Sequence, residues 1–349
     1  MPPRILIVRL SALGDIVHAV PVLSAIRRHD PSAEIDWLVE ESYAPLLELV
    51  DGLRRRIIVR AGETGTRGND VVFSGGTGYL KAAAYLRRQH YDIALDLQGL
   101  IKSAAWARVS GATRVIGFAP GHLREPHAAR LYTETVIPPE APHIIQKNLA
   151  LAAHLGAQVS PFTVPLSAVP SAVLSATVED AVGPARYAVL NPGAAWPNKR
   201  WPPARFGALA EQLLHRFGLV SFITWGPSER ALAEDIVRVS GGAARLAPPT
   251  ELADLASLMR GAALVVSGDT GPLHIAAAMG APIVGLFGPT RPERNGPWDP
   301  DDEVISRAAR CKCHHKRQCL IGAPCINDIS LDEVIQAADR RLAKERRVS

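Results

Sequence analysis

The sequence predicts an α/β protein built from two doubly wound parallel sheets, one in each half of the chain. Continuous apolar runs, such as ILIVRL at residues 5–10, are typical of strands that are buried on both faces. Segments with the apolar spacing of helices follow several of these runs, and this alternation gives a parallel sheet. The alternation starts again after a stretch rich in Pro, Ser and Val. We therefore expect two similar Rossmann-like domains that face each other across a cleft.

Each half contains several candidate elements. After the opening run we expect strands in IDWLV, RRIIV, DIALDL and RVIGF, with helices in KAAAYLRRQHY and LIKSAAWARV. Residues 16–28 are expected to form one helix despite Pro21. The second half gives strands in YAVLN, LVSFIT, ALVVS and PIVGLF, separated by helices. The predicted domains are 1–160, a linker over 161–175, 176–325, and a final helical segment over 326–349 that can pack back on the first domain.

The composition is that of a globular protein long enough for two domains. Of 349 residues, 47% are hydrophobic and 21% are charged. The net charge of +5 is too small to indicate a dedicated nucleic-acid binder, but it suits an anionic ligand or an anionic membrane surface. No apolar run approaches the ~20 residues of a membrane span, and the start lacks the pattern of a signal peptide. We expect a cytoplasmic protein, with contact to the inner face of the membrane left open.

Unusual residues follow five of the predicted strands, and ligands of such sheets bind beyond the carboxyl ends of the strands. These loops are SALGD, QGLIKS, NPGAAWPNKRWP, WGPSER and GDTGPLH. SALGD lacks the glycine spacing of G-x-G-x-x-G, so the first domain is a poor candidate for NAD. Asp15 in that loop is either a catalytic acid or base, or a carboxylate that pairs with a helix dipole. Lys199 and Arg200 are either a phosphate clamp or solvated charges.

The segment at 268–274 predicts an anion site. Gly271 and Pro272 begin a helix, whose exposed N–H groups and dipole favour a phosphate. The Thr270 hydroxyl can donate a hydrogen bond to a phosphate, and the Asp269 carboxylate can accept hydrogen bonds from sugar hydroxyls. The alternative is that Asp269 or Thr270 only caps the helix and that His274 is a packed core residue.

Taken in order, these motifs resemble the ADP-heptose:lipopolysaccharide heptosyltransferases of glycosyltransferase family 9 over nearly the whole chain. The forms GDIVH, QGLIKSA and REP are similar to the heptosyltransferase I type, whereas the cysteine segment is more similar to heptosyltransferase II types. The other matching stretches are NPGAAWPNKRWP, WGPSER and SGDTGPLHIAAAMGAPIVGLFGPT. The resemblance implies a GT-B fold and inverting transfer of heptose from ADP-heptose to an inner-core acceptor, most simply the Kdo of Kdo-lipid A. It implies no essential metal ion.

The resemblance also implies roles for individual residues. Asp15 matches the general base, and Lys199 matches the lysine at the donor phosphates. The implied donor site contains Lys199, Glu229, Asp269, Thr270, Gly271 and His274, and the implied acceptor residues are Lys102 and Arg124. Ala194 and Ala195 stand where some members have threonines, so hydroxyl contacts are lost there.

Basic residues are frequent in the predicted first domain, which we expect to present a basic face to an anionic lipid A and Kdo acceptor. For most of them the alternative is ordinary solvated charge. They are Arg54, Arg55, Arg56, Arg60, Lys81, Arg87, Arg88, Lys102 and Arg124.

All four cysteines lie close together, near His314 and His315. They are Cys311, Cys313, Cys319 and Cys325. Clustered thiolates can hold a structural Zn²⁺ or iron ion, and free thiols are the alternative. Two other functions stay open for the whole chain. One is a sugar-nucleotide epimerase or phosphorylase of similar fold, and the other is a two-lobed binding protein without catalysis.

Overall fold

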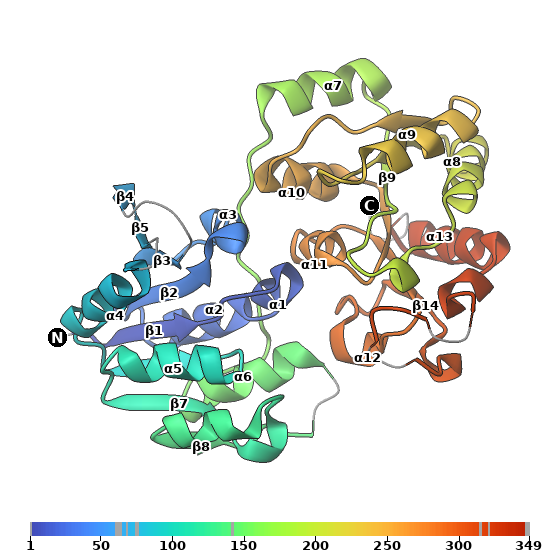
Figure 1. The fold of residues 1–349 in the computed structure, drawn as a ribbon. Coiled ribbons are helices and arrows are strands. Elements are labelled where there is room, and N and C mark those ends of the chain that lie inside the picture. The colour runs from blue at the N-terminus through green and yellow to red at the C-terminus, as the bar shows by residue number, and fades with distance from the viewer. Residues whose placement is uncertain are drawn as a thin grey trace. The chain divides into compact units, whose positions relative to one another are not determined.

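The computed structural model describes residues 2–59, 65–67, 69–73, 77–140, 143–313, 316–319 and 322–345. The chain divides into two compact units, Met1–Ser167 and Ala168–Ser349 (Figure 1). Each unit contains one sheet covered by helices, which confirms the predicted pair of α/β folds.

The sheet of unit 1 has the strand order β4-β5-β3-β2-β1-β6-β7-β8. All neighbouring pairs are parallel except β4 with β5 at the edge. The central strand β1 is buried at nearly every position, which explains its continuous apolar sequence. The strands are β1 (Arg4–Val8), β2 (Glu34–Glu40), β3 (Arg55–Val59), β4 (Gly65–Arg67), β5 (Asp70–Phe73), β6 (Ile93–Asp96), β7 (Arg114–Phe118) and β8 (Glu134–Val136).

The helices of unit 1 connect these strands. They are α1 (Leu13–Val17), α2 (Val20–His29), α3 (Ala44–Glu48), α4 (Gly78–Arg88), α5 (Ile101–Val109) and α6 (Ile144–His154). The single helix expected over 16–28 is wrong, because the chain forms two helices that are separated at residues 18–19. Pro21 lies in the first turn of α2. A proline is tolerated there because the first N–H groups of a helix have no partner within it.

The sheet of unit 2 is entirely parallel, with the order β11-β10-β9-β12-β13-β14. Its strands are β9 (Tyr187–Asn191), β10 (Val220–Ile223), β11 (Ala244–Leu246), β12 (Leu264–Gly268), β13 (Ile283–Phe287) and β14 (Glu303–Ser306). Its helices are α7 (Ala172–Val182), α8 (Pro203–Phe217), α9 (Arg230–Val239), α10 (Leu252–Gly261), α11 (Gly271–Ala278), α12 (Pro292–Asn295) and α13 (Leu331–Glu345).

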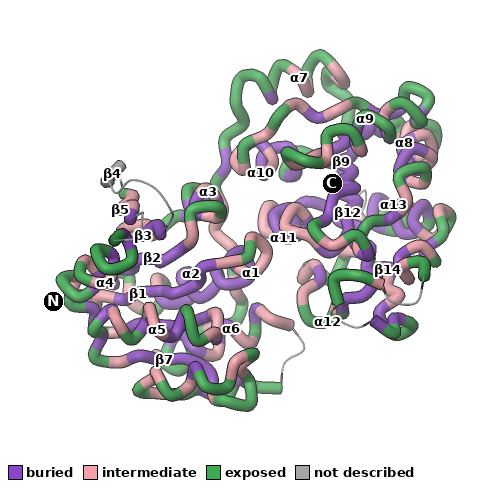
Figure 2. The backbone as a smooth tube through the Cα atoms, in the orientation of Figure 1, coloured by how far each residue is buried: buried purple, intermediate pink, exposed green. Residues whose placement is uncertain are grey.

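Helices cover both faces of this second sheet. Leu190 packs in a core with α8, α9 and α13, whereas Val189 packs in another with α7, α10 and α11. Adjacent residues of one strand point to opposite faces, so both faces of β9 are apolar. Figure 2 shows the buried strands in purple between exposed helix faces in green.

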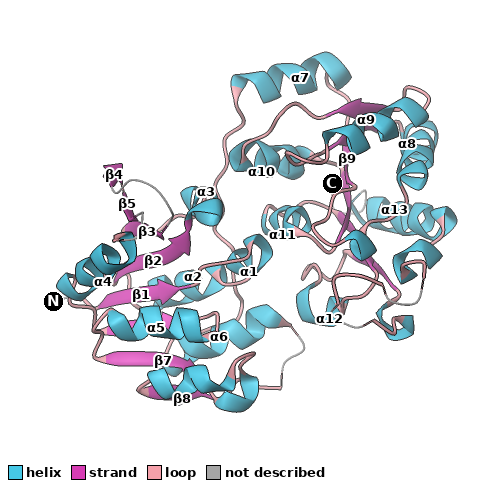
Figure 3. Cartoon of the chain, viewed as in Figure 1, coloured by secondary structure: helices cyan, strands magenta, loops and turns pink. Residues whose placement is uncertain are grey.

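Several elements differ from the expected ones (Figure 3). Helix α7 begins at Ala172, inside the stretch 161–175 expected as a linker, and Ser171 accepts a hydrogen bond from the Leu174 N–H as its N-cap. Helix α13 packs on α8, β13 and β14 of its own unit. Its packing toward the first domain stays a prediction. Among the described residues, no helix is both long and apolar enough to cross a membrane.

Candidate functional sites at the carboxyl ends of the strands

Lys199 and Asp269 form an ion pair at the carboxyl edge of the unit 2 sheet. The Lys199 ammonium donates to Asp269 Oδ2 at 2.6 Å and to the Asp269 carbonyl at 3.2 Å. It also lies 4.8 Å from the centre of the Trp196 ring. An ammonium group has three N–H donors, so one remains for a ligand. Gly268 lets the two loops meet, since an added β-carbon would lie 2.8 Å from the Lys199 carbonyl oxygen.

Asp269 is only 5% exposed, and both of its carboxylate oxygens are engaged. Asn295 donates to Oδ1 at 2.6 Å, and His274 Nε2 lies 3.4 Å from the same oxygen. Burial alone would raise the pKa of Asp269, but the His274 contact and the Lys199 charge lower it well below its usual range. These contacts favour Asp269 as the group that fixes Lys199, rather than as an acceptor of sugar hydroxyls.

Thr270 and Gly271 form the start of α11 beside this ion pair. Thr270 is the N-cap residue, with no side-chain cap hydrogen bond, and its hydroxyl accepts from Asn191 Nδ2 at 3.1 Å. Lys199 follows β9 and α11 follows its parallel neighbour β12, so the first N–H groups of α11 lie at the same edge of the sheet as Lys199. This arrangement can bind an anion because the helix dipole and the lysine carry positive charge at one place.

Glu229 is the N-cap residue of α9 and lies against the loop that contains Lys199. It accepts a hydrogen bond from the Gly226 N–H at 3.1 Å, and Arg200 lies 3.9 Å from its Oε1. A β-carbon at Gly193 would overlap the Glu229 carboxylate, so the glycine makes this approach possible. The structure therefore brings all six predicted donor residues to one edge of the unit 2 sheet.

Asp15 lies at the carboxyl edge of the unit 1 sheet, in the first turn of α1. Arg9 directly follows β1. It contacts Asp15 Oδ2 at 2.8 Å and also donates to the Leu97 carbonyl. Arg9 is 8% exposed, whereas the Asp15 side chain is 41% exposed. The carboxylate is therefore fixed from one side and open on the other. Arg9 is not among the predicted site residues, although a charge at the end of a buried strand is a usable signal.

Lys102 and Arg124 follow β6 and β7 at this same edge. Lys102 pairs with Glu40, as Lys199 does with Asp269. Arg124 is exposed and forms no ion pair within the described part of the chain. Glu125 next to it accepts a hydrogen bond from the Ile101 N–H at 2.7 Å, so the two loops are joined.

Three of the nine basic residues lie at the opposite edge, where β3 begins. Arg54 pairs with Asp36 and Glu34, and Arg56 pairs with Asp70.

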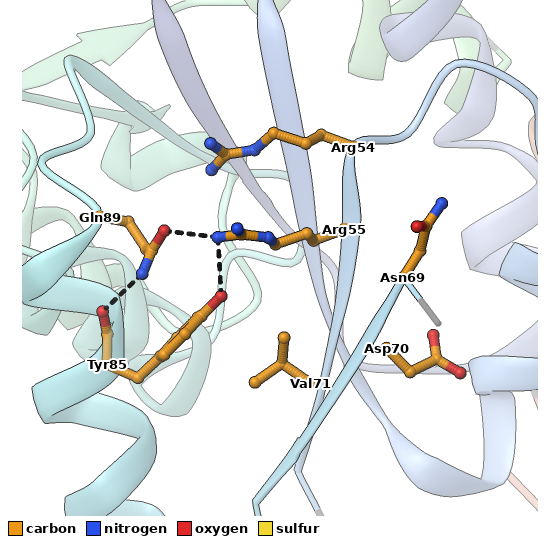
Figure 4. A pocket seen from close by; sticks show the side chains of 7 residues that line it. All are labelled: Arg54, Arg55, Asn69, Asp70, Val71, Tyr85 and Gln89. Carbon is orange, nitrogen blue, oxygen red and sulfur yellow. Dashed lines mark hydrogen bonds between the residues drawn. The ribbon is translucent and has the colours of Figure 1, made fainter. Parts of the chain in front are cut away.

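Arg55 donates to Tyr85 Oη and to Gln89 Oε1. Figure 4 shows these bonds in a cavity of about 560 Å³, which is lined by Arg54 and Arg55 of the predicted basic face but by none of the predicted catalytic or donor residues. Arg60 lies outside the described residues.

The four cysteines form close pairs. The Sγ atoms of Cys313 and Cys319 lie 3.7 Å apart. Burial, together with a hydrogen bond to Cys311, raises the pKa of Cys325 to about 12. In the described part of the chain, no group of three or more His, Cys, Asp or Glu side chains can hold a metal ion. The expected structural metal is therefore not supported. His314 and His315 lie outside the described residues.

Comparison with known proteins identifies the family. The model of glycosyltransferase family 9 (heptosyltransferase) matches residues 79–323. The chain belongs to glycosyltransferase family 9. Lipopolysaccharide heptosyltransferase 1 of Pseudomonas aeruginosa is 31% identical over 90% of this chain and 87% of its own length.

Two solved family 9 structures share the fold. The Escherichia coli heptosyltransferase WaaC with ADP has a TM-score of 0.68 and 23% identity over 98% of both chains. The Escherichia coli ADP-heptose heptosyltransferase II has a TM-score of 0.75 and 22% identity, covering 98% of this chain and 99% of that one. Both GT-B neighbours cover both units, so the fold agrees with the GT-B prediction and does not separate type I from type II.

Proposed function

We propose that this glycosyltransferase moves heptose from ADP-heptose to the Kdo of a lipopolysaccharide inner-core acceptor, with inversion at the anomeric carbon. The observation that carries the proposal is the Lys199–Asp269 pair beside the start of α11. It supplies a fixed ammonium group with one N–H donor left for a ligand, next to the first N–H groups of α11 at the same edge of the sheet, which suits the diphosphate of a nucleotide sugar. The ADP in the related WaaC structure supports this choice of donor.

Asp15 acts in this proposal as the general base. A sugar hydroxyl is a weak nucleophile, so a carboxylate must take its proton as the oxygen attacks the anomeric carbon. Arg9 contacts Oδ2 and leaves Oδ1 for the hydroxyl proton. General base catalysis of this kind contributes about 10²–10⁴-fold to the rate.

Lys199 and the first N–H groups of α11 stabilise the leaving group. The bond from the anomeric carbon to the phosphate oxygen breaks, and the electron pair stays on ADP. A lysine already fixed by Asp269 needs little reorganisation when this charge develops, and such electrostatic stabilisation is often the largest contribution to catalysis. Direct displacement by one hydroxyl inverts the anomeric configuration.

The choice of Kdo as acceptor rests on the 31% identity to a heptosyltransferase 1 and on the GDIVH, QGLIKSA and REP motifs. The test supplies ADP-heptose with Kdo-lipid A or with heptosyl-Kdo-lipid A and measures the glycosylated product. We expect product with Kdo-lipid A. Product only with heptosyl-Kdo-lipid A would assign a type II function instead.

The same assay without acceptor tests the other functions. A transferase consumes ADP-heptose quickly only when acceptor is present. Conversion of the sugar nucleotide without acceptor would indicate an epimerase. Donor binding with no turnover under either condition would indicate a binding protein.

A further inference from the structure

Helices α4 and α5 of unit 1 carry positive charge without any acidic residue. Their sequences, GYLKAAAYLRR and IKSAAWARV, contain five Lys or Arg residues and no Asp or Glu. Lys81, Arg88 and Arg108 are exposed, and they form no ion pair within the described residues. Lys102 pairs with Glu40.

Large apolar side chains are exposed on the same two helices. Leu80 is 73% exposed, Tyr79 is 50% exposed and Ile101 is 48% exposed. The ring centres of Tyr79 and Trp106 lie 6.0 Å apart, so the apolar residues of α4 continue onto α5. Single exposed apolar residues are ordinary, but a group of them among unpaired cations is typical of a surface that docks on an anionic membrane.

The position of this group in the fold agrees with that use. Helices α4 and α5 begin after the parallel strands β5 and β6, so Tyr79, Leu80 and Ile101 lie at the carboxyl edge of the sheet. Asp15 lies at the same edge. The Ile101 N–H donates to Glu125, the neighbour of Arg124, at 2.7 Å.

We propose that the exposed face of α4 and α5 docks on the anionic surface of a phospholipid membrane. Tyr79, Leu80 and Ile101 enter the headgroup region where the two helices begin, and Lys81 contacts lipid phosphates beside them. Arg88 and Arg108 lie seven residues after Lys81 and Ile101, on the same side of each helix and about 10 Å further along it, and contact lipid phosphates there. A lipid-linked acceptor then reaches the edge that carries Asp15 without leaving the bilayer. This last step rests on the proposed function, whereas the membrane contact does not.

Sedimentation with vesicles tests the contact directly. We expect the full chain to sediment with vesicles that contain phosphatidylglycerol and to stay in solution with phosphatidylcholine alone. Added salt weakens the binding because it screens the lysine and arginine charges. Leu80→Ser should lower the affinity about tenfold or more, since a leucine side chain loses its burial. Lys81→Gln should lower it about fivefold, and adding Arg88→Gln should multiply that loss.

Val173→Ser on α7 is the matched control. Val173 is 66% exposed on a helix with Glu179 and Asp180 but no cation, so its removal should leave vesicle binding unchanged. Ile101→Ser is a second apolar variant that repeats the test if Leu80→Ser does not fold. Equal binding by wild type and both apolar variants, or no preference for anionic vesicles, would overturn the proposal. So would loss of a self-associated form in these variants, because that result assigns the face to a second copy of the chain.

Enzyme assays separate this proposal from the proposed function. With a deacylated, water-soluble acceptor, Leu80→Ser should turn over like wild type. With acceptor embedded in anionic vesicles, its rate should fall about tenfold at limiting lipid. If wild type fails on both acceptors but still binds vesicles, the proposed function is wrong and the docking surface stands. If Leu80→Ser matches wild type on embedded acceptor, the docking surface is wrong.

Discussion

Replacing Lys199 separates its contribution to stability from its contribution to donor binding. In Lys199→Met the buried Asp269 loses its cation, and breaking such a pair costs about 3–5 kcal/mol of unfolding free energy. We expect about 3 kcal/mol, because Asn295 and His274 still contact Asp269 Oδ1. If Lys199 binds the diphosphate as proposed, ADP loses one charge-assisted hydrogen bond, worth about 1.5–3 kcal/mol, and its affinity should fall about tenfold to a hundredfold.

The double variant Lys199→Met/Asp269→Asn distinguishes the two effects. Removing both charges should return the unfolding free energy to within about 1 kcal/mol of wild type, because no buried charge is left unpaired. ADP affinity should stay low. Urea unfolding and titration calorimetry measure the two quantities. Arg238→Met, which removes an exposed charge of unit 2, is the control for net charge. Wild-type ADP affinity in the double variant would refute the assignment of Lys199 to the diphosphate.

Three further predictions concern single groups. Arg9→Met should lower kcat about tenfold with the KM for ADP-heptose unchanged, because Asp15 loses its orientation; an unchanged kcat in steady-state assays would contradict this. Arg124→Glu should raise the acceptor KM and spare donor binding, and equal acceptor kinetics would remove Arg124 from the acceptor site. Folding lowers the pKa of Asp269. The carboxylate therefore contributes fully to the free energy of unfolding above its unfolded pKa of about 3.9, and this contribution is lost as the pH falls toward the lower pKa of the folded state. Acid unfolding of Lys199→Met/Asp269→Asn should therefore depend less on pH in this range than that of wild type, and identical slopes would contradict the assignment.

The sequence predicts the central strands well and the short edge elements poorly. Strands such as β1 and β9 are buried on both faces, so they are continuously apolar and easy to recognise. Strands β11 and β14 have only three and four residues, and their partly exposed sequences are not continuously apolar. Helix α7 buries mainly Leu174, so its sequence has little apolar periodicity.

The candidate site shows a similar division. The residues within one loop, such as Asp269, Thr270 and His274, are visible in the sequence because a single motif contains them. The partners that fix them come from other elements, and no local pattern marks them. Asn295 lies on α12 after the next strand, and Arg9 contacts Asp15 from the end of β1. Such contacts depend on how the strands are ordered in the sheet.

In the proposed mechanism, Asp15 is the base for transfer of heptose from ADP-heptose. The most direct measurement is the single-turnover rate of Asp15→Asn with Kdo-lipid A, alongside the affinity of the same variant for ADP-heptose. Asparagine keeps the shape and exposure of Asp15 but cannot take the hydroxyl proton. We predict a rate at least about 10²-fold below wild type, with donor affinity unchanged. A wild-type rate in Asp15→Asn, or a loss confined to donor affinity, would contradict the account.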